Sequence, residues 1–281
     1  MEAGLKILSP YLLFLLVTAS PLAGWWINSL SGDIPNNFPH IIAPLISACF
    51  MVARRNRIGA PSSPRFPVPL LFFSFLCLLV LVLGYFVHYY FLSGMAWIAM
   101  IFCTVRFSWD AAHVKHMNFP ILFLFFALPW YAWVNQILGF ELQLFSAIFA
   151  YHGYHLLGIS AIREGIYVYT DNFDMVLEPG CSGLSYTFAL LYTGVLMAAL
   201  SQRTRLAKML VIGSVIPVAL LANGLRVFFI GLIGYHYGSA MAESVYHEYG
   251  GFLFFGIALL SLFAMTALVN RVDLSKKETL S

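Results

Sequence analysis

Long apolar runs separated by short polar segments form most of the chain. Many of these runs approach the roughly 20 residues that a transmembrane helix needs, and we interpret eight of them as membrane crossings. They are Leu5–Ile27, Phe38–Ala53, Val68–Tyr90, Phe91–Val105, Phe119–Val134, Gly183–Leu200, Met209–Ile233 and Phe252–Val269. The pattern therefore predicts an all-α polytopic membrane protein, with residues 1–281 in a single integral membrane domain.

Three segments depart from this pattern. Glu141–Ile159 mixes Glu, Gln and His with apolar residues, which is typical of a helix lying in the membrane interface. Gly165–Leu177 has β-branched and aromatic residues on both sides of a Thr-Asp-Asn turn signal and predicts a small extracytoplasmic β-hairpin. Arg54–Pro69 is rich in Pro, Ser and Arg and resembles a linker.

The composition agrees with a membrane protein and excludes a water-soluble core. Of the 281 residues, 61% are hydrophobic and only 10% are charged, against roughly 25% charged in a soluble domain. The net charge of +3 is too small to indicate nucleic-acid binding. The N-terminal segment has the charged start of a signal peptide, but its apolar run is too long and continues into Trp25 and Trp26. We therefore interpret it as an uncleaved first crossing.

Basic residues predict the orientation, because Lys and Arg near short loops are retained in the cytoplasm. Eight crossings with both termini inside place the following residues there: Lys6, Arg54, Arg55, Arg57, Arg65, Arg106, Lys115, Arg203, Arg205, Lys208, Arg271, Lys276 and Lys277. Arg163 and Arg226 are the exceptions. The acids gather outside: Asp33, Glu141, Glu164, Asp171, Asp174, Glu178, Glu243 and Glu248. A ninth crossing at Glu141–Ile159 would put one basic loop outside, so we expect this segment on the outer surface.

The stretch EPGCSGL, Glu178–Leu184, places a cysteine between glycines at the outer start of a crossing. Pro179 suits a first helical turn and Gly180 removes bulk around the thiol, so we expect Cys181 at a helix N-terminus. The helix dipole there favours the nucleophilic thiolate. A cysteine that only packs under a turn is the alternative.

The other cysteines do not indicate comparable chemistry. Cys49, Cys77 and Cys103 lie inside apolar runs, where a thiol usually serves as a small hydrophobe. We expect no disulfide framework, and no CxxC pair indicates zinc.

Arg226, in LLANGLRVFFIGLIG, is the one basic residue inside the interior of an expected crossing. Inserting an arginine there costs at least ~2.5 kcal/mol, so a functional partner or a wet cavity is the default interpretation. At ~1.5 Å per residue it lies about 10 Å below the outer end of its helix. Asn223, three residues earlier, shares its face and could orient the guanidinium or a substrate carbonyl. A snorkelling arginine in a structural ion pair is the alternative.

His247, in SVYHEYGGFLFFG, is expected in the outer loop before the last crossing, where His236 is a competitor. A solvated loop histidine is the ordinary interpretation. His247 meets the outer boundary near Cys181 and Arg226, however. A cysteine, a histidine and an arginine form an acyl-transfer set of nucleophile, general acid or base, and fixed cation.

A metal site is less consistent with the sequence. His113 and His116 lie in a cytoplasmic loop, while His152 and His155 share a helical face. Neither pair has an obvious third and fourth ligand. We therefore expect no metal and no cofactor.

Three motifs resemble those of a known family. EPGCSGLSY, NGLRV and YHEYGGFLFF, at the starts and ends of the last three crossings, are similar to motifs of the exosortase and archaeosortase family of membrane transpeptidases. LQLFSA and the GI-x-x-I-REG-I run ahead of the cysteine extend the resemblance. It covers residues 119–269, the expected catalytic core, whereas residues 1–118 match only in being hydrophobic and form variable N-terminal helices.

The resemblance implies that Cys181, Arg226 and His247 are the catalytic residues. It also implies the substrate, which is a secreted protein with a C-terminal tail made of a short motif such as Pro-Glu-Pro, a transmembrane helix and a basic cluster. Such an enzyme cuts near the motif and passes the acyl group to an acceptor at the cell surface or in a matrix. Glu178-Pro179 departs from the small residue expected before the cysteine, which leaves the subtype open.

The remaining expectations concern support and location. We expect four residues to bind substrate or to support the site: Asn223, Ser182, Gly183 and Glu178. If Arg226 binds a glutamate of the substrate, backbone amides near Ser182 and Gly183 are the alternative site for the oxyanion. The protein is expected in the cell membrane with its active site facing outward. A transporter or lipid-binding protein that uses Arg226 as an anion site is the alternative from another class, and a cysteine protease without acyl transfer is a nearer one.

Overall fold

The computed structural model describes residues 19, 22–25, 27, 34–58, 67–109, 111–201, 204–245 and 250–278. Two compact units, Met1–Trp130 and Tyr131–Ser281, divide the chain and are described separately. Five described helical segments are long and apolar enough to cross a membrane: Val68–Phe86, Tyr90–Ser108, Pro179–Ser201, Arg205–Tyr237 and Gly251–Val272. The all-α polytopic prediction is therefore confirmed in class, while the count of eight crossings stays a prediction. Most of the expected first crossing, Leu5–Ile27, lies outside the described residues.

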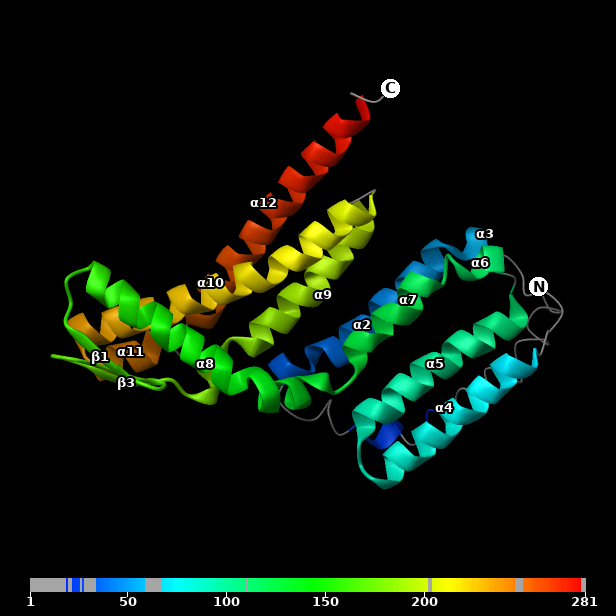
Figure 1. The fold of residues 1–281 in the computed structure, drawn as a ribbon, viewed down its shortest axis with the longest axis horizontal. Coiled ribbons are helices and arrows are strands. Elements are labelled where there is room, and N and C mark those ends of the chain that lie inside the picture. The colour runs from blue at the N-terminus through cyan, green and yellow to red at the C-terminus, as the bar shows by residue number, and fades with distance from the viewer. Residues whose placement is uncertain are drawn as a thin grey trace. The chain divides into compact units, whose positions relative to one another are not determined.

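The first unit contains helices of very different length. They are α2 (Ile34–Ala53), α3 (Arg55–Ile58), α4 (Val68–Phe86), α5 (Tyr90–Ser108), α6 (Ala111–Val114), α7 (Asn118–Phe123) and the 3-10 helix η1 (Leu124–Ala127). The helices α4 and α5 lie side by side, and α2 packs against α7 and η1 (Figure 1). His40 ties α2 to η1, because its buried Nδ1 donates a hydrogen bond of 2.9 Å to the carbonyl oxygen of Ala127.

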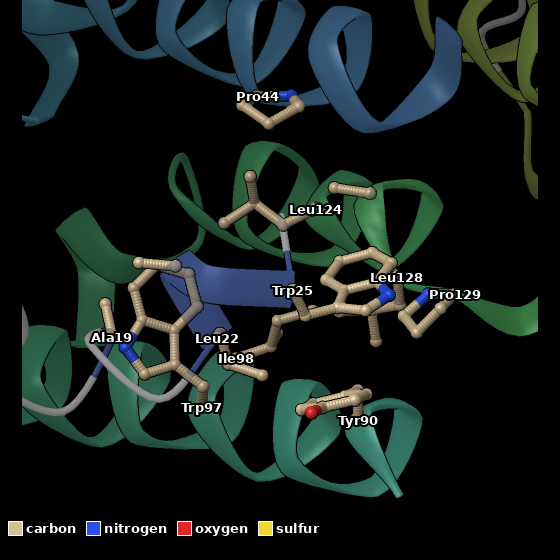
Figure 2. Close-up of a pocket in the computed structure, with 12 residues that line it drawn as sticks. Ala19, Leu22, Trp25, Pro44, Tyr90, Trp97, Ile98, Leu124, Leu128 and Pro129 are labelled. Carbon is tan, nitrogen blue, oxygen red and sulfur yellow. The ribbon is translucent and has the colours of Figure 1, made fainter. Parts of the chain in front are cut away.

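An apolar cavity of about 320 Å³ lies within the first unit. Figure 2 shows Trp25, Trp97, Leu124 and Leu128 along its walls. Trp25 stacks on Tyr90 with ring centroids 6.3 Å apart and meets His40 edge-on at 5.0 Å. None of the residues predicted to carry the chemistry lines this cavity.

The expected crossing Phe119–Val134 is not one helix, so the boundaries predicted for it were wrong. Its first part forms α7 and η1, and its second part opens α8, which runs from Trp130 to Leu156. The break falls at Leu128, which has extended backbone with ψ of 156°, because the residue before a proline is pushed out of the helical region. The interfacial helix expected at Glu141–Ile159 is therefore the second half of a 27-residue helix.

The second unit combines α8 with a small sheet and three long helices. Its remaining elements are β1 (Ala161–Glu164), β2 (Tyr167–Thr170), β3 (Asp174–Val176), the 3-10 helix η2 (Pro179–Ser182), α9 (Leu184–Ser201), α10 (Arg205–Tyr237), α11 (Ser239–Val245) and α12 (Gly251–Glu278). Figure 1 shows α9, α10 and α12 side by side, and they share a core of buried apolar side chains around Val215 and Leu262. The predicted hairpin is confirmed as β2 and β3, and β1 adds a third antiparallel strand.

Glycines on α10 let the sheet and α8 approach its backbone closely. A Cβ added at Gly234 would lie 2.5 Å from the Phe173 ring, and one at Gly231 would contact the Tyr154 hydroxyl. The Tyr154 hydroxyl donates to the carbonyl oxygen of Phe228 at 3.3 Å, and burial raises the pKa of this phenol, which keeps it a donor. The sheet is thereby fixed on the end of α10 that follows Arg226.

Candidate active site

Cys181 lies on a single 3-10 turn, η2, that precedes α9. The backbone N–H of Cys181 donates to the carbonyl oxygen of Glu178 at 2.8 Å, and Pro179 occupies the first helical turn as predicted. Gly183 then takes a left-handed conformation with φ of 68°, and α9 begins at Leu184. Cys181 therefore lies in the first turn of the segment Pro179–Ser201, but this turn is a 3-10 turn that Gly183 separates from α9. The thiol precedes the long helix instead of starting it.

The cysteine turn is open on one side and packed on the other. Glu178, Pro179 and Gly180 are exposed, and Cys181 is half-buried. Cys181 packs against a buried cluster that includes Ala147, Ala150 and Val227. An approaching molecule can therefore reach the turn on its exposed side while α8 and α10 support it from beneath.

Asn223, on α10, fixes the backbone of the cysteine. Its Nδ2 donates to the carbonyl oxygen of Cys181 at 2.7 Å and to Ser146 Oγ at 2.9 Å. Ser146 Oγ itself donates to the carbonyl oxygen of Leu142 at 3.0 Å, so it accepts from Asn223. Both partners of Asn223 are thus acceptors, which assigns the amide orientation. With 7% of its surface exposed, Asn223 is a buried bridge between α8 and the cysteine turn.

Gly183 is required by this bridge for two reasons. Its φ of 68° lies in the region that favours glycine. A Cβ at this position would also lie 2.6 Å from Asn223 Oδ1 and 2.8 Å from Asn223 Cβ. The glycine after the cysteine therefore makes room for the asparagine that fixes the cysteine.

Arg226 follows Asn223 by one helical turn and faces the same way. It is 4% exposed, and its Nη1 lies 3.5 Å from the carbonyl oxygen of Gly180, the limit of a hydrogen bond. Its guanidinium carbon lies 5.5 Å from the ring centroid of Tyr186, within the range of a cation–π interaction. Tyr186 in turn packs on Phe255 of α12 with centroids 5.7 Å apart. The cation is thus held next to the cysteine turn.

Little space is left on the inner side of this cation. The cavity bounded by Tyr186, Asn223, Arg226 and Phe254 has a volume of about 10 Å³, roughly what one water molecule needs. A peptide cannot enter there. A larger molecule that contacts the cysteine turn therefore does so on its exposed side.

Two polar residues on α8 support the site and were not predicted to do so. Gln143, 7% exposed, donates from Nε2 to the carbonyl oxygen of Leu177 at 2.9 Å, and Ser146 contacts Asn223 as described. The two lie three residues apart, on one face of the helix. Both lie in LQLFSA, which contributes to the family resemblance, but no role was assigned to them. Their partners are distant in the chain, and the partner of Gln143 is a backbone carbonyl.

The other predicted site residues have different outcomes. Ser182 is buried, and its Oγ accepts a long hydrogen bond of 3.4 Å from the backbone N–H of Leu184. Glu178 is exposed at the start of the turn. His247 lies outside the described residues. Gly250, three residues after His247, is described, and a Cβ added there would lie 3.8 Å from Arg226 Nε.

No site for a metal ion emerges in the part of the chain that the structure describes. There, no group of three or more His, Cys, Asp or Glu side chains is arranged to hold one. The chemistry that can be read from the site is that of a thiol, a buried cation and backbone amides.

The comparisons with known proteins give one match. The family model described as transmembrane exosortase matches residues 26–264, which includes most of the N-terminal region that resembled the family only in hydrophobicity. Membership of this family supports a general role as a membrane transpeptidase in protein sorting. No curated protein and no solved structure matches the chain. Because the match covers well over half of its length, the chain belongs to the transmembrane exosortase family.

Proposed function

We propose that this protein is a membrane cysteine transpeptidase that cleaves the C-terminal sorting tail of secreted proteins and transfers them to an acceptor. The tail consists of a Pro-Glu-Pro-like motif, a transmembrane helix and a basic cluster. The family supports protein sorting and cysteine-dependent acyl transfer in general. The identity of the tail and the roles of individual residues form our proposal.

The observation that carries the proposal is that two side chains of α10 contact the backbone of the cysteine turn. Asn223 contacts the carbonyl oxygen of Cys181, and Arg226, one turn later, approaches that of Gly180. Two consecutive carbonyl groups at the nucleophile are thus held by one rigid helix that also carries a buried cation. Such preorganisation is what acyl transfer requires, because charge develops within a few ångströms of the attacking sulfur.

The proposed reaction has two steps. The thiolate of Cys181 attacks the carbonyl carbon of the scissile peptide bond, and the collapse of the tetrahedral intermediate breaks the C–N bond and leaves a thioester. The departing amine takes a proton, for which His247 is the proposed donor. An acceptor amine then attacks the thioester, gives a proton to His247 and releases the thiolate.

Arg226 is proposed to stabilise the developing oxyanion. Its guanidinium is already fixed by Tyr186, so little reorganisation is needed when charge appears. If Arg226 instead binds a substrate carboxylate, the backbone amides near Ser182 and Gly183 take over the oxyanion. Glu178, exposed at the start of the turn, is proposed to contact the substrate.

A membrane-held tail suits this site. The transmembrane helix of the substrate would present the bond near the membrane surface, so that insertion supplies much of the positioning. We place the site on the extracytoplasmic side of the cell membrane with both termini in the cytoplasm, on the basis of the distribution of Lys and Arg.

The test uses a reporter protein with such a tail, co-produced with the full chain. We expect Cys181→Ala, Cys181→Ser and Arg226→Ala to abolish tail removal. Cys77→Ala is the matched control, because Cys77 is a buried thiol of α4 in the first unit and should be dispensable. A membrane-impermeant alkylating reagent added outside should label Cys181 and block processing.

Product analysis separates the competing interpretations. Mass spectrometry that finds a new amide at the cut site supports transpeptidation, whereas a free carboxylate means a protease without acyl transfer. A Cys181→Ala chain that still removes the tail would refute the cysteine mechanism. Loss of function in Arg226→Ala alone, with Cys181→Ala unaffected, is what an anion transporter or lipid-binding protein requires.

A further inference from the structure

The strand that leads to the cysteine is an edge strand. In the three-stranded sheet the order is β1-β2-β3, so β3 pairs with β2 on one side only. In the part of the chain that the structure describes, no strand lies on its other side. Val176 is 47% exposed and Asp174 is also exposed. An exposed edge strand offers a row of backbone donors and acceptors for another extended chain.

The outward-facing backbone groups of β3 belong to Asp174 and Val176. Thr170 N–H donates to the Phe173 carbonyl at 3.1 Å, and Leu177 N–H donates to the Ile166 carbonyl at 3.2 Å. Hydrogen-bonded and non-hydrogen-bonded pairs alternate along an antiparallel ladder. The odd-numbered residues of β3 and its flanks therefore turn their backbone groups toward β2. The even-numbered residues turn theirs toward the open edge.

The edge is held rigidly and ends next to the nucleophile. Met175 and Phe173 pack against the α10 glycines, and Gln143 holds the Leu177 carbonyl at 2.9 Å. Four residues separate Val176 from Cys181, and the 3-10 turn η2 holds the backbone of Cys181 against the Glu178 carbonyl at 2.8 Å, close to the end of the strand. A chain paired along β3 would thus continue directly to the exposed side of the cysteine turn.

We infer that the open edge of β3 binds the extended backbone of the peptide that is to be cleaved, as an added fourth strand. This inference rests on the proposed function and names how the substrate peptide is held at that site. Hydrogen bonds from the backbone groups of Asp174 and Val176 would supply affinity that depends little on the peptide sequence. They would also fix the register in which the scissile bond reaches Cys181.

Proline at position 176 provides the mutational test. Val176→Pro removes the outward N–H while it leaves pairing to β2 intact, since proline is tolerated at an edge position whose N–H faces outward. Val176→Ala removes the side chain and keeps the N–H. Arg163→Pro, measured against Arg163→Ala, makes the same backbone change at an outward-facing position on the opposite edge strand β1.

The readout is kcat/KM for the tail-bearing reporter, together with the rate of Cys181 alkylation. For Val176→Pro we expect kcat/KM to fall roughly five- to ten-fold relative to Val176→Ala, the size of one lost hydrogen bond, mainly through KM. The alkylation rate of Cys181 should not change. Arg163→Pro should match Arg163→Ala. Equal kcat/KM for Val176→Pro and Val176→Ala would overturn the inference and leave the proposed function standing.

Substrate backbone methylation gives a readout that needs no turnover. Peptides that span the tail motif, each N-methylated at one successive amide, are measured for binding to the Cys181→Ala chain. Strand addition predicts that methylation weakens binding at every second amide. Binding with this period, combined with no tail removal by the chain that keeps Cys181, would support the edge and refute the transpeptidase. Uniform sensitivity to methylation, or no binding, would refute the edge.

Discussion

Asn223 Nδ2 lies 2.7 Å from the carbonyl oxygen of Cys181, although the two residues are 42 positions apart in the chain. The same nitrogen lies 2.9 Å from Ser146 Oγ on α8. One amide group therefore joins the cysteine turn, α8 and α10. The backbone of the proposed nucleophile is thus held by a buried side chain from a different helix.

Replacing Asn223 by aspartate should impair the enzyme without changing its shape. A carboxylate cannot donate to the Cys181 carbonyl, and its charge would face two oxygen acceptors. We expect a loss of about 1–3 kcal/mol of stability, measured by thermal unfolding in detergent, and at least a ten-fold fall in kcat for tail removal. Asn172→Asp, at an exposed turn position, is the control and should leave both unchanged. An active Asn223→Asp enzyme would exclude the bridge as a requirement.

Alanine at position 183 should be poorly tolerated. The residue has a φ of 68°, and an added Cβ would lie 2.6 Å from Asn223 Oδ1, so both the backbone and the bridge would have to shift. We expect the processing rate to fall more than ten-fold. Gly213→Ala, within α10 and with no atom near the added methyl, should be neutral or slightly stabilising. Similar activity in the two variants would contradict the geometry.

A double mutant tests the contact between α9 and α12. A Cβ at Gly251 would contact the Tyr186 hydroxyl, so Gly251→Ala should push Tyr186 away from Arg226 and lower activity. Tyr186→Phe removes that oxygen and keeps the ring over the guanidinium. The double variant should therefore recover activity. The recovery should be only partial, because the ring carbon still lies 3.1 Å from the added methyl. Strictly additive losses in kcat would argue against this contact.

Gln143 can be tested by methionine, which has a similar volume and no donor. Gln143→Met leaves the Leu177 carbonyl without its side-chain partner, at a cost of about 1–3 kcal/mol in the free energy of unfolding. Without this hydrogen bond the segment before the cysteine should move more freely, which should also raise the rate of Cys181 alkylation. Gln136→Met, at an exposed position of α8, is the matched control. An alkylation rate unchanged in both would show that Gln143 does not position the turn.

The sequence predicts those features of the fold that local pattern determines. The helices α9 and α10 begin and end within a few residues of the apolar runs, and the Thr-Asp-Asn signal lies at the β2–β3 turn. The helix α12 begins one residue before its predicted run but continues to Glu278, well beyond the predicted end at Val269. The strand β1 was missed because AIRE is short and lacks a strong alternation. Its pairing depends on β2, which only the folded chain supplies.

The candidate site is predictable in its residues more than in its geometry. Cys181 and Asn223 attract notice by type and place, and the structure brings them together. The left-handed Gly183, which sets η2 apart from α9, cannot be distinguished from a helical glycine by sequence alone. Gln143 is equally hidden, because its partner is the backbone of a residue 34 positions away.

The length of α10 affects how deep in the membrane Arg226 is expected to lie. Its 33 residues extend about 50 Å, whereas the hydrocarbon core of a bilayer is about 30 Å thick. A crossing that starts at Arg205 is complete after about 32 Å, at Arg226. On this count the remaining turns, with Gly231 and Gly234, would hold the sheet beyond the hydrocarbon. We therefore expect the buried Arg226 near the edge of the hydrocarbon, where a charge costs less than at the centre of the bilayer.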